Sequence, residues 1–422
     1  MYQITTLKNG MKIVTHEHKD AQTVFVEIQF KAGAKYSSRG KEGIAHFTEH
    51  VVMNGSPKYP SGLKVREAVE QLGGRINGRT GSETVSYWIK LSADDLEKGL
   101  DILFSITSSP LLNEKEAKGE RKIILEEIAR MHDAPMRRVV NALFGTIYKD
   151  HTLGLPVIGH VRTIKEVGVS DIKKFFNAYY TPPNAIVSVA GRISHEEIVR
   201  LTQNYFGNQK KNSPPSYTPF QLQQTGPQVT VLKEKTKQSR MALGFTGKPI
   251  TIRDYAVTSF LTSLLHSSGR LFRRLREEEQ LSYDIGASAV TITDLPFLMI
   301  HGGFTYRKVK RALLVICEEL QKVKETAVSK EEFAKLKKSK ETGLLFALEN
   351  PEGWVDFALD WNQLIGEVIT PQRWLEEVRR VTLGDVQKLA QGTFVPQNAF
   401  LAASHHEIKP AELKEILQEG LS

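Results

Sequence analysis

The sequence has only one cysteine, Cys317, among its 422 residues. A lone cysteine excludes an internal disulfide and a cluster of thiolate metal ligands. Long apolar runs are missing too, since no stretch approaches the roughly 20 residues that a membrane-spanning helix needs. The opening residues, MYQITTL, alternate like a strand and carry neither the charged leader nor the apolar core of a signal peptide. These absences predict a cytoplasmic protein without membrane contact, or a periplasmic one whose leader has been removed.

No single sign of charge dominates the chain. It has 57 Lys and Arg against 48 Asp and Glu, a net charge of +9. Such a basic balance can indicate nucleic-acid binding, but here the basic residues alternate with acids in helical stretches. The sequence also lacks a basic arm, zinc-finger spacing and an aromatic RNA-binding motif. We therefore expect solvated helix faces with some attraction for acidic partners, and no nucleic-acid binding.

An internal repeat divides the chain. The length alone allows two to four domains, at roughly 100–200 residues each. Segments beginning at Asp171 and Asp385, 214 residues apart, both read as a helix, a Pro/Asn turn and an apolar strand. This period is about half the chain, which favours a duplicated domain over a solenoid. The Asn-, Gln-, Ser- and Pro-rich segment 209–227 reads as a linker, so we predict domains at 1–208 and 228–422.

Strands and helices are mixed in both halves without strict βαβ alternation. The pattern predicts an α+β protein of two tandem homologous domains, each a mixed, largely antiparallel sheet flanked by helices. In the second half we expect strands within 228–246 and 283–304. We expect helices at 252–277, 306–326, 330–349 and 371–391, and we assign no element to 350–370.

The segment from Gly43 to Gly55 carries the strongest chemical signal. Its apolar residues are spaced for one buried helical face. His46 and His50 are four residues apart, so both side chains lie on one face and can bind one ion. Glu49 lies at the adjacent edge, where it can accept a proton from water without occupying the ion. The order His-x-x-Glu-His is the inverted zincin pattern, and these ligands favour Zn²⁺ with an open position.

A zinc site of this kind needs a third protein ligand on a neighbouring rigid element. Glu120 and Glu127 are seven residues apart on a strongly helical stretch and share one face, whereas Glu126 points about 100° away. Taken on the residues alone, these acids fit a solvated helix face better than a metal site. Likewise, His46 and His50 could be two unrelated surface histidines.

Together these residues resemble the M16 family of zinc peptidases, the pitrilysin, insulysin and mitochondrial processing peptidase group, and within it the half-length bacterial M16B-like members. That family carries HxxEH and a ligand Glu 77 residues after the second His, where this chain has Glu127. The resemblance implies Zn²⁺ bound by His46, His50 and Glu127, with Glu49 as general base and Glu120 as a supporting acid. It covers nearly the whole chain, and implies a LuxS/MPP-like fold forming half of a clamshell.

The resemblance also implies substrate-binding residues. Asn77 and Gly78, the latter where the family usually has Ala, fall on its active-site edge strand, which would pair with an extended peptide. Arg276 and Tyr283 resemble the family's Arg/Tyr pair, which would hold the substrate and polarise the scissile carbonyl. Without the resemblance, these two read as a helix-end charge and a strand aromatic. In half-length members this face comes from the other subunit, so each site would be completed in trans.

The second copy lacks the metal ligands. The offset of 214 places Phe260 and Leu264 opposite His46 and His50, so this domain is expected to serve as a wall. A smaller departure is the run Met53-Asn54-Gly55-Ser56, where the family usually has Phe-Lys-Gly-Thr. We expect that change to be structural only.

These expectations combine into a predicted function. The chain is predicted to be a zinc metalloendopeptidase that cleaves small or unfolded peptides in the closed chamber of a homodimer. The size restriction follows from the family architecture alone. One alternative is the catalytic-type subunit of an obligate heterodimer with a paralogue. Another is a non-proteolytic scaffold or regulatory paralogue, against which the intact set His46, Glu49, His50 and Glu127 argues.

Overall fold

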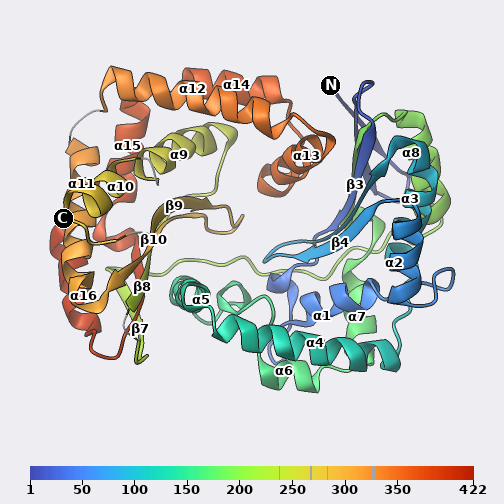
Figure 1. Cartoon of the computed structure of the whole chain (residues 1–422), viewed down its shortest axis with the longest axis horizontal. Coiled ribbons are helices and arrows are strands. Elements are labelled where there is room, and N and C mark those ends of the chain that lie inside the picture. The colour runs from blue at the N-terminus through green and yellow to red at the C-terminus, as the bar shows by residue number, and fades with distance from the viewer. Residues whose placement is uncertain (237, 267–268, 283, 326–327) are drawn as a thin grey trace. The chain divides into compact units, whose positions relative to one another are not determined.

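The computed structural model describes residues 1–422 except 237, 267–268, 283 and 326–327 (Figure 1). The chain forms two compact units, each built around one sheet with helices against it. Unit 1 comprises 1–130, 155–218 and 345–370, and unit 2 comprises 131–154, 219–344 and 371–422. Both sheets are mixed and mainly antiparallel, which confirms the predicted α+β class.

Unit 1 contains a six-stranded sheet in the order β1-β2-β6-β3-β5-β4. Only the β2/β6 pair is parallel among its described pairings. Its strands alternate or are fully apolar, as half-buried and central strands require. Strand β4 is an edge strand of this sheet. The bounds are β1 Tyr2–Thr6, β2 Lys12–Glu17, β3 Thr23–Phe30, β4 Arg75–Thr80, β5 Val85–Ser92 and β6 Ala185–Gly191.

Unit 2 contains a five-stranded sheet in the order β7-β11-β8-β10-β9. Here the parallel pair is β7/β11, which corresponds to β2/β6 of unit 1. The bounds are β7 Gln228–Leu232, β8 Gln238–Thr246, β9 Asp284–Val290, β10 Phe297–Thr305 and β11 Ala399–Ser404.

The repeat seen in the sequence is repeated in the structure at the same offset of 214. Helix α7 (Val169–Tyr179) and strand β6 in unit 1 match α15 (Leu383–Thr393) and β11 in unit 2. The turns between them, Pro182–Asn184 and Pro396–Asn398, are both single 3₁₀ turns. The described chain is therefore two copies of one architecture.

Each unit borrows one helix from the other half of the sequence. Helix α13 (Pro351–Ile365), in the segment where no element was expected, lays Val355, Ala358 and Leu359 on the sheet of unit 1. Helix α5 (Pro135–Tyr148) packs Val139 and Leu143 into the core on the sheet of unit 2. The compact units therefore differ from the contiguous domains predicted at 1–208 and 228–422, because 131–154 and 345–370 are exchanged.

The remaining helices of unit 1 cover the other face of its sheet and one end of it. Helices α3 and α8 pack against β5 and β2, on the face opposite α13, and α1 packs against β4 and α7 (Figure 1). The bounds are α1 Ile44–Val52, α2 Gly62–Gln71, α3 Leu96–Ser108, α4 Glu114–His132, α6 Val161–Glu166 and α8 His195–Phe206.

Two helices expected in the second half are each divided. The helix predicted at 252–277 is α9 (Ile252–Leu265), then α10 (Arg270–Phe272) continuing into a π-helical turn at Arg273–Glu278. The one predicted at 371–391 is α14 (Pro371–Arg380) followed by α15, because Thr382 caps a new helix start. The others are α11 Val309–Glu325, α12 Lys330–Ala347 and α16 Pro410–Gly420. None of the described helices combines the length and apolarity needed to cross a membrane.

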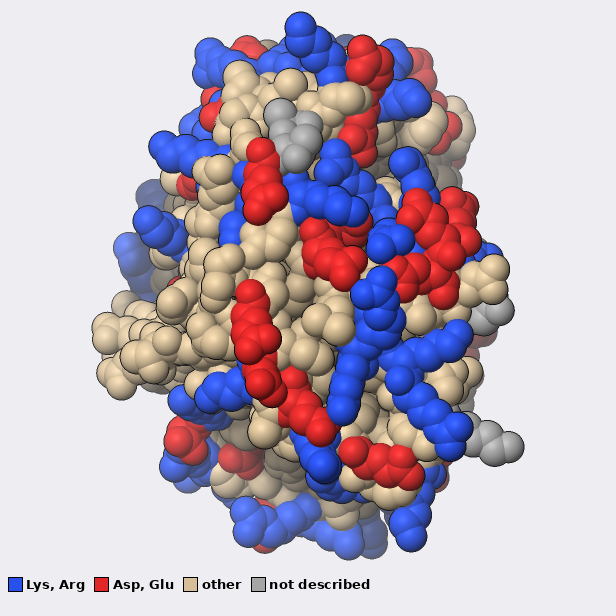
Figure 2. Space-filling model, turned by 90° about the vertical axis from the view of Figure 1, so that its left-hand side faces the viewer, with Lys and Arg blue, Asp and Glu red and all other residues tan. Residues whose placement is uncertain are grey.

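Surface charges are interleaved as the sequence indicated. On the face shown in Figure 2, basic and acidic side chains alternate over short distances. In unit 2, for example, Arg311 binds both Glu279 and Glu318, and Lys310 lies 2.6 Å from Glu412. Such pairing places opposite charges next to one another on the surface, and the expectation of no nucleic-acid binding stays a prediction.

Candidate metal centre

Helix α1 presents both histidines of the sequence motif. The helix begins after Gly43, and two features require glycine at this position. Its φ is 89°, which is in the left-handed region, and an added Cβ would lie 2.5 Å from the carbonyl oxygen of Ile158. Phe47 and Val51 are fully buried on the inner face of this helix. The helix is thus fixed from its start and along its length.

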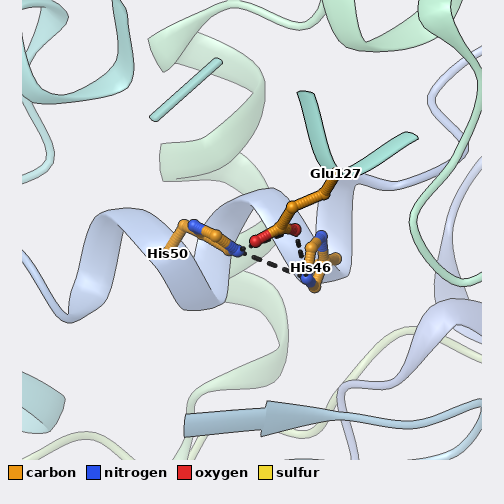
Figure 3. Close-up of side chains that lie close together, drawn as sticks. All are labelled: His46, His50 and Glu127. Atoms are coloured by element: carbon orange, nitrogen blue, oxygen red, sulfur yellow. Dashed lines mark hydrogen bonds and ion pairs between the residues drawn. The ribbon is translucent and has the colours of Figure 1, made fainter. Parts of the chain in front are cut away.

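Three side chains converge beside α1 (Figure 3). The Nε2 atoms of His46 and His50 lie 3.3 Å apart, and Oε2 of Glu127, from α4, lies 3.8 Å and 3.7 Å from them. Ligands at roughly 2.0–2.1 Å from a tetrahedral zinc ion are separated by about 3.3–3.4 Å. The distance between the histidines matches this value, and the distances to Glu127 exceed it by about 0.3–0.5 Å. The three atoms therefore lie close to zinc-ligand spacing, and the two-imidazole, one-carboxylate donor set suits Zn²⁺. The structure brings together the three residues that the sequence resemblance indicated as ligands.

Glu120 orients His50. Its Oε2 lies 2.7 Å from Nδ1 of His50, and an ionised carboxylate only accepts, so Nδ1–H donates and Nε2 keeps its lone pair for a metal. Burial lowers the pKa of His50, but the Glu120 hydrogen bond and nearby carboxylates outweigh it, and the pKa is raised. Burial raises the pKa of Glu120, yet its bonds from His50 and Asn54 leave it lowered. The lowered pKa keeps Glu120 ionised, so the hydrogen bond from Nδ1–H is charge-assisted even when the ring of His50 is neutral and Nε2 is free to bind a metal.

The two histidines differ in their surroundings. Burial, and then the charge of His50, lowers the pKa of His46 to about 3, so its ring stays neutral at ordinary pH. Its Nε2 faces the cluster, while its buried Nδ1 has no hydrogen-bond partner among the described residues. His50 is therefore held by a carboxylate, and His46 is held mainly by packing.

Glu49 lies next to the cluster but is not part of it. Thr80 donates a hydrogen bond of 2.9 Å to its Oε2, and a Cβ on Gly78 would lie 2.6 Å from its Oε1. Burial raises the pKa of Glu49, opposed by the charge of His50 and the Thr80 bond. The missing side chain of Gly78, on β4, thus leaves room for the carboxylate of Glu49. The raised pKa of Glu49 brings this carboxylate closer to the range of a general base.

Strand β4 is anchored on its other face. Both oxygens of Glu27, fully buried on β3, accept from Nη2 of Arg79 at 2.8 Å and 3.0 Å. The same nitrogen donates to Asp356 of α13 at 3.0 Å, and Nε donates to Ser86 at 3.0 Å. Because side chains alternate along a strand, Gly78 and Thr80 face Glu49 while Arg79 faces α13.

The residues predicted to bind substrate are distributed as follows. Asn77 is exposed on edge strand β4, and its Oδ1 accepts from the backbone N–H of Gly78 at 2.9 Å. Arg276 is exposed on the π-helical turn of unit 2, with its guanidinium 4.8 Å from the ring centre of Phe272. Tyr283 lies outside the described residues. Their roles in substrate binding stay predictions.

Two supporting residues were not assigned to the site from the sequence. Asn54, in the run 53–56 whose departure from the family was expected to be structural only, bonds to Glu120 at 2.7 Å, and Thr80 bonds to Glu49. The periodicity of helices and strands could have indicated both residues. Asn54 lies one helical turn after His50, and Thr80 lies two residues after Gly78 on the same face of a strand.

The corresponding helix of unit 2 carries no such centre. Phe260 and Leu264, on α9, are buried in the core. The described part of the chain contains no second group of three His, Cys, Asp or Glu donors this close together.

Two models of one protein family match the chain. Residues 12–161 match the model described as Insulinase (Peptidase family M16), and residues 166–340 match the Peptidase M16 inactive domain. The first match contains the three converging side chains together with Glu49 and Glu120. The second contains α9 and the turn that carries Arg276.

Related proteins match over nearly their whole length. A protein of Rickettsia felis described as an uncharacterized zinc protease is 26% identical over 396 residues, 93% of this chain and 95% of its own. One of Bacillus subtilis with the same description is 25% identical over 401 residues, 94% of this chain and 97% of its own.

Solved structures share the fold. A Helicobacter pylori protease superposes with a TM-score of 0.88 at 24% identity, covering 96% of this chain and 99% of that one. A Pseudomonas fluorescens structure described as a peptidase M16 inactive domain gives 0.87 at 13% identity, covering 96% and 98%.

Proposed function

Because the chain belongs to the M16 family of peptidases, we propose that it is a zinc endopeptidase with Glu49 as its general base. The observation that carries the proposal is the convergence of His46, His50 and Glu127 at zinc-ligand spacing beside that buried carboxylate. When bound, zinc supplies a Lewis acid that polarises the peptide carbonyl and makes water more acidic.

The chain's own groups move the proton. Glu49 takes a proton from the attacking water and later delivers it to the leaving amine. Thr80 holds one oxygen of Glu49 in place, which leaves the other to meet the water. Glu120 keeps His50 in one tautomer throughout.

Substrate binds as an added strand. The free edge of β4 offers main-chain groups to an extended peptide next to Glu49, and this mode reads backbone more than side chains. We therefore expect broad preference for unfolded peptides, with Asn77 beside the bound strand. Arg276 and Tyr283 are proposed to hold the scissile carbonyl from the partner subunit of a homodimer, whose closed chamber would admit only small or unfolded chains. The single, buried Cys317 is consistent with action in the cytoplasm.

The test is a comparison of three variants with the wild type. Zinc per chain is measured on purified protein, its mass in solution is determined, and cleavage of a quenched unstructured peptide is followed. We expect about one zinc per chain in the wild type. Glu49→Gln should keep the zinc and lose activity by roughly 10²–10⁴-fold, the usual contribution of a general base. Glu127→Gln should lose the zinc.

The matched control is Glu126→Gln, which changes an exposed acid on the same helix. It should keep both zinc and activity. Equal activity in the wild type and Glu49→Gln would refute the mechanism. Bound zinc without cleavage by any preparation would favour the alternatives, an obligate heterodimer or a non-proteolytic paralogue.

A further inference from the structure

Asn54, the second residue after α1, is hydrogen-bonded to two residues of the metal centre. Asn54 is 9% exposed, and its Nδ2 donates to Oε1 of Glu120 at 2.7 Å and to the backbone oxygen of His50 at 3.2 Å. The other oxygen of Glu120 accepts from His50 at 2.7 Å. Both oxygens of this carboxylate are therefore engaged, one by the metal-facing histidine and one by Asn54.

Asn54 is itself held from its far side. Its Oδ1 lies against Gly62, the first residue of α2, where an added Cβ would lie 2.4 Å from that oxygen. Gly62 is not among the glycines with positive φ, so its backbone does not require glycine. The missing side chain makes room for Asn54 between α1 and α2.

We propose that Asn54 is a positioning residue of the metal centre, which fixes Glu120 and through it the ring of His50. A carboxylate with one partner can rotate about its last bond, and an imidazole that it holds can then turn away from the ion. Outer partners of metal ligands typically contribute 10–100-fold in metal affinity. Because Asn54 acts one contact further out, we expect an effect of about 10-fold, the low end of that range. The proposal rests on the proposed function only in taking the ion to be zinc.

The test measures zinc affinity by chelator competition, without substrate. Asn54→Ala should weaken zinc binding about 10-fold. Asn54→Asp keeps the shape but replaces the donor with an acceptor beside Glu120, so it should weaken binding further. Unchanged affinity in Asn54→Asp would overturn the proposal, whatever happens to Asn54→Ala.

A double-mutant cycle with Gly62 tests the geometry independently. Gly62→Ala should displace the amide of Asn54 and also weaken zinc binding, whereas in an Asn54→Ala background it should add little. Fully additive losses would overturn the proposed route through Asn54.

The matched control is Asn184→Ala. Asn184 is 8% exposed in the same unit, and its Nδ2 also donates two hydrogen bonds, to the carbonyls of Lys31 and Tyr179. Its loss should lower the melting temperature and leave zinc affinity unchanged. An equal loss of zinc affinity in Asn184→Ala would mean that general loosening explains the Asn54 result. Since no cleavage is measured, an inactive wild type would refute the proposed function without affecting this test.

Discussion

Units 1 and 2 share one architecture, but the corresponding helices α1 and α9 carry different side chains at the two positions aligned with His46 and His50. In unit 1, His46 and His50 lie beside Glu127 of α4, and in unit 2 the aligned positions on α9 are the buried Phe260 and Leu264. The order β2-β6-β3-β5-β4 of unit 1 corresponds to β7-β11-β8-β10-β9 of unit 2, including the parallel pair, and only β1 lacks a counterpart among the described strands. The architecture therefore does not depend on the metal centre. What distinguishes unit 1 is a small group of polar side chains, namely His46, His50 and Glu127 with the neighbouring Glu49 and Glu120.

The largest predicted effect comes from making α1 resemble α9. The double variant His46→Phe/His50→Leu should lose zinc and, with it, several kcal/mol of transition-state stabilisation, which is about 10³-fold or more in rate. Its circular dichroism spectrum should remain that of the wild type. Metal analysis measures the loss of zinc, and peptide cleavage measures the loss of rate. A spectrum with much less helix than the wild type would show that α1 cannot carry the apolar residues of α9.

The reverse exchange is the control for that comparison. Phe260→His/Leu264→His should gain no zinc, because both positions are fully buried in the apolar core, where an ion and its polar ligands would be costly to desolvate. It should instead lower the melting temperature. Tight zinc binding by this variant would contradict the view that α4 supplies the decisive ligand.

The next prediction concerns how the units divide the work. If unit 2 of one subunit completes the site of its partner, Glu49→Gln and Arg276→Ala chains should each be weak but complement on mixing. Random exchange yields half mixed dimers with one intact site, so about a quarter of wild-type activity should return. Unequal mixing ratios should shift the yield accordingly, and no recovery after verified subunit exchange would argue against sites formed in trans.

A smaller effect is expected from the anchoring of β4 by Arg79, which pairs with Glu27 of β3 and Asp356 of α13. Arg79→Leu leaves the fully buried Glu27 without its cation, and because Arg79 itself is half exposed we expect a loss of unfolding free energy of at most about 3 kcal/mol, the low end for a broken buried pair. The double variant Glu27→Gln/Arg79→Leu should recover much of this loss. The control is Lys90→Met, whose pair with Glu352 is exposed and worth about 1 kcal/mol or less. Denaturant unfolding distinguishes these cases, and equal losses in Arg79→Leu and Lys90→Met would refute the anchoring.

The smallest effect concerns the two exchanged helices. Helix α13 stacks Trp354 on His16, with ring centres 3.5 Å apart, whereas α5 packs on unit 2 mainly through apolar residues. Burial, and then the charges of the N-terminus and His18, lowers the pKa of His16 to about 4. In the unfolded chain His16 is protonated below about pH 6.5, whereas in the folded chain it is protonated only below about pH 4. Stability should therefore fall with falling pH in that window.

His16→Phe removes this one titration and keeps a ring against Trp354. The drop in unfolding free energy between pH 6.5 and 4 should be about 2 kcal/mol smaller than in the wild type, measured on metal-free protein. The other histidines titrate in both proteins, so only the difference between them is informative. Identical pH profiles would show that the stacked ring is not protonated on unfolding in this range.

The sequence predicted the local parts of this structure well. The spacing within α1 placed His46, Glu49 and His50, and the repeat placed α7 and α15 at one offset. Assigning Glu127 over the other acids of α4 required the family resemblance, because a helix face carries no information about which neighbour it meets. The proximity of Gly78 to Glu49 depends on tertiary packing for the same reason.

Helix α13 shows the limit most directly. Local signals for it exist, since Asn350 caps its start, Pro351 occupies the first turn and Gly366 ends it with φ of 75°. Its partners, however, are strands more than 150 residues earlier, such as β3 and β6. The residue pattern of a helix does not indicate which sheet the helix will cover. The sequence therefore could not predict that α13 belongs to unit 1 and α5 to unit 2.

That exchange has a consequence for how such a chain can change over time. A fragment ending in the linker would lack the helix that covers Val14, Phe25 and Ile186, and would present that apolar face to water. The second copy is therefore needed for the fold of the first, even though its described residues form no cluster of metal ligands. Because each unit includes a helix from the other half of the sequence, neither half contains all the elements of its own unit, and we expect each half to need the other in order to fold.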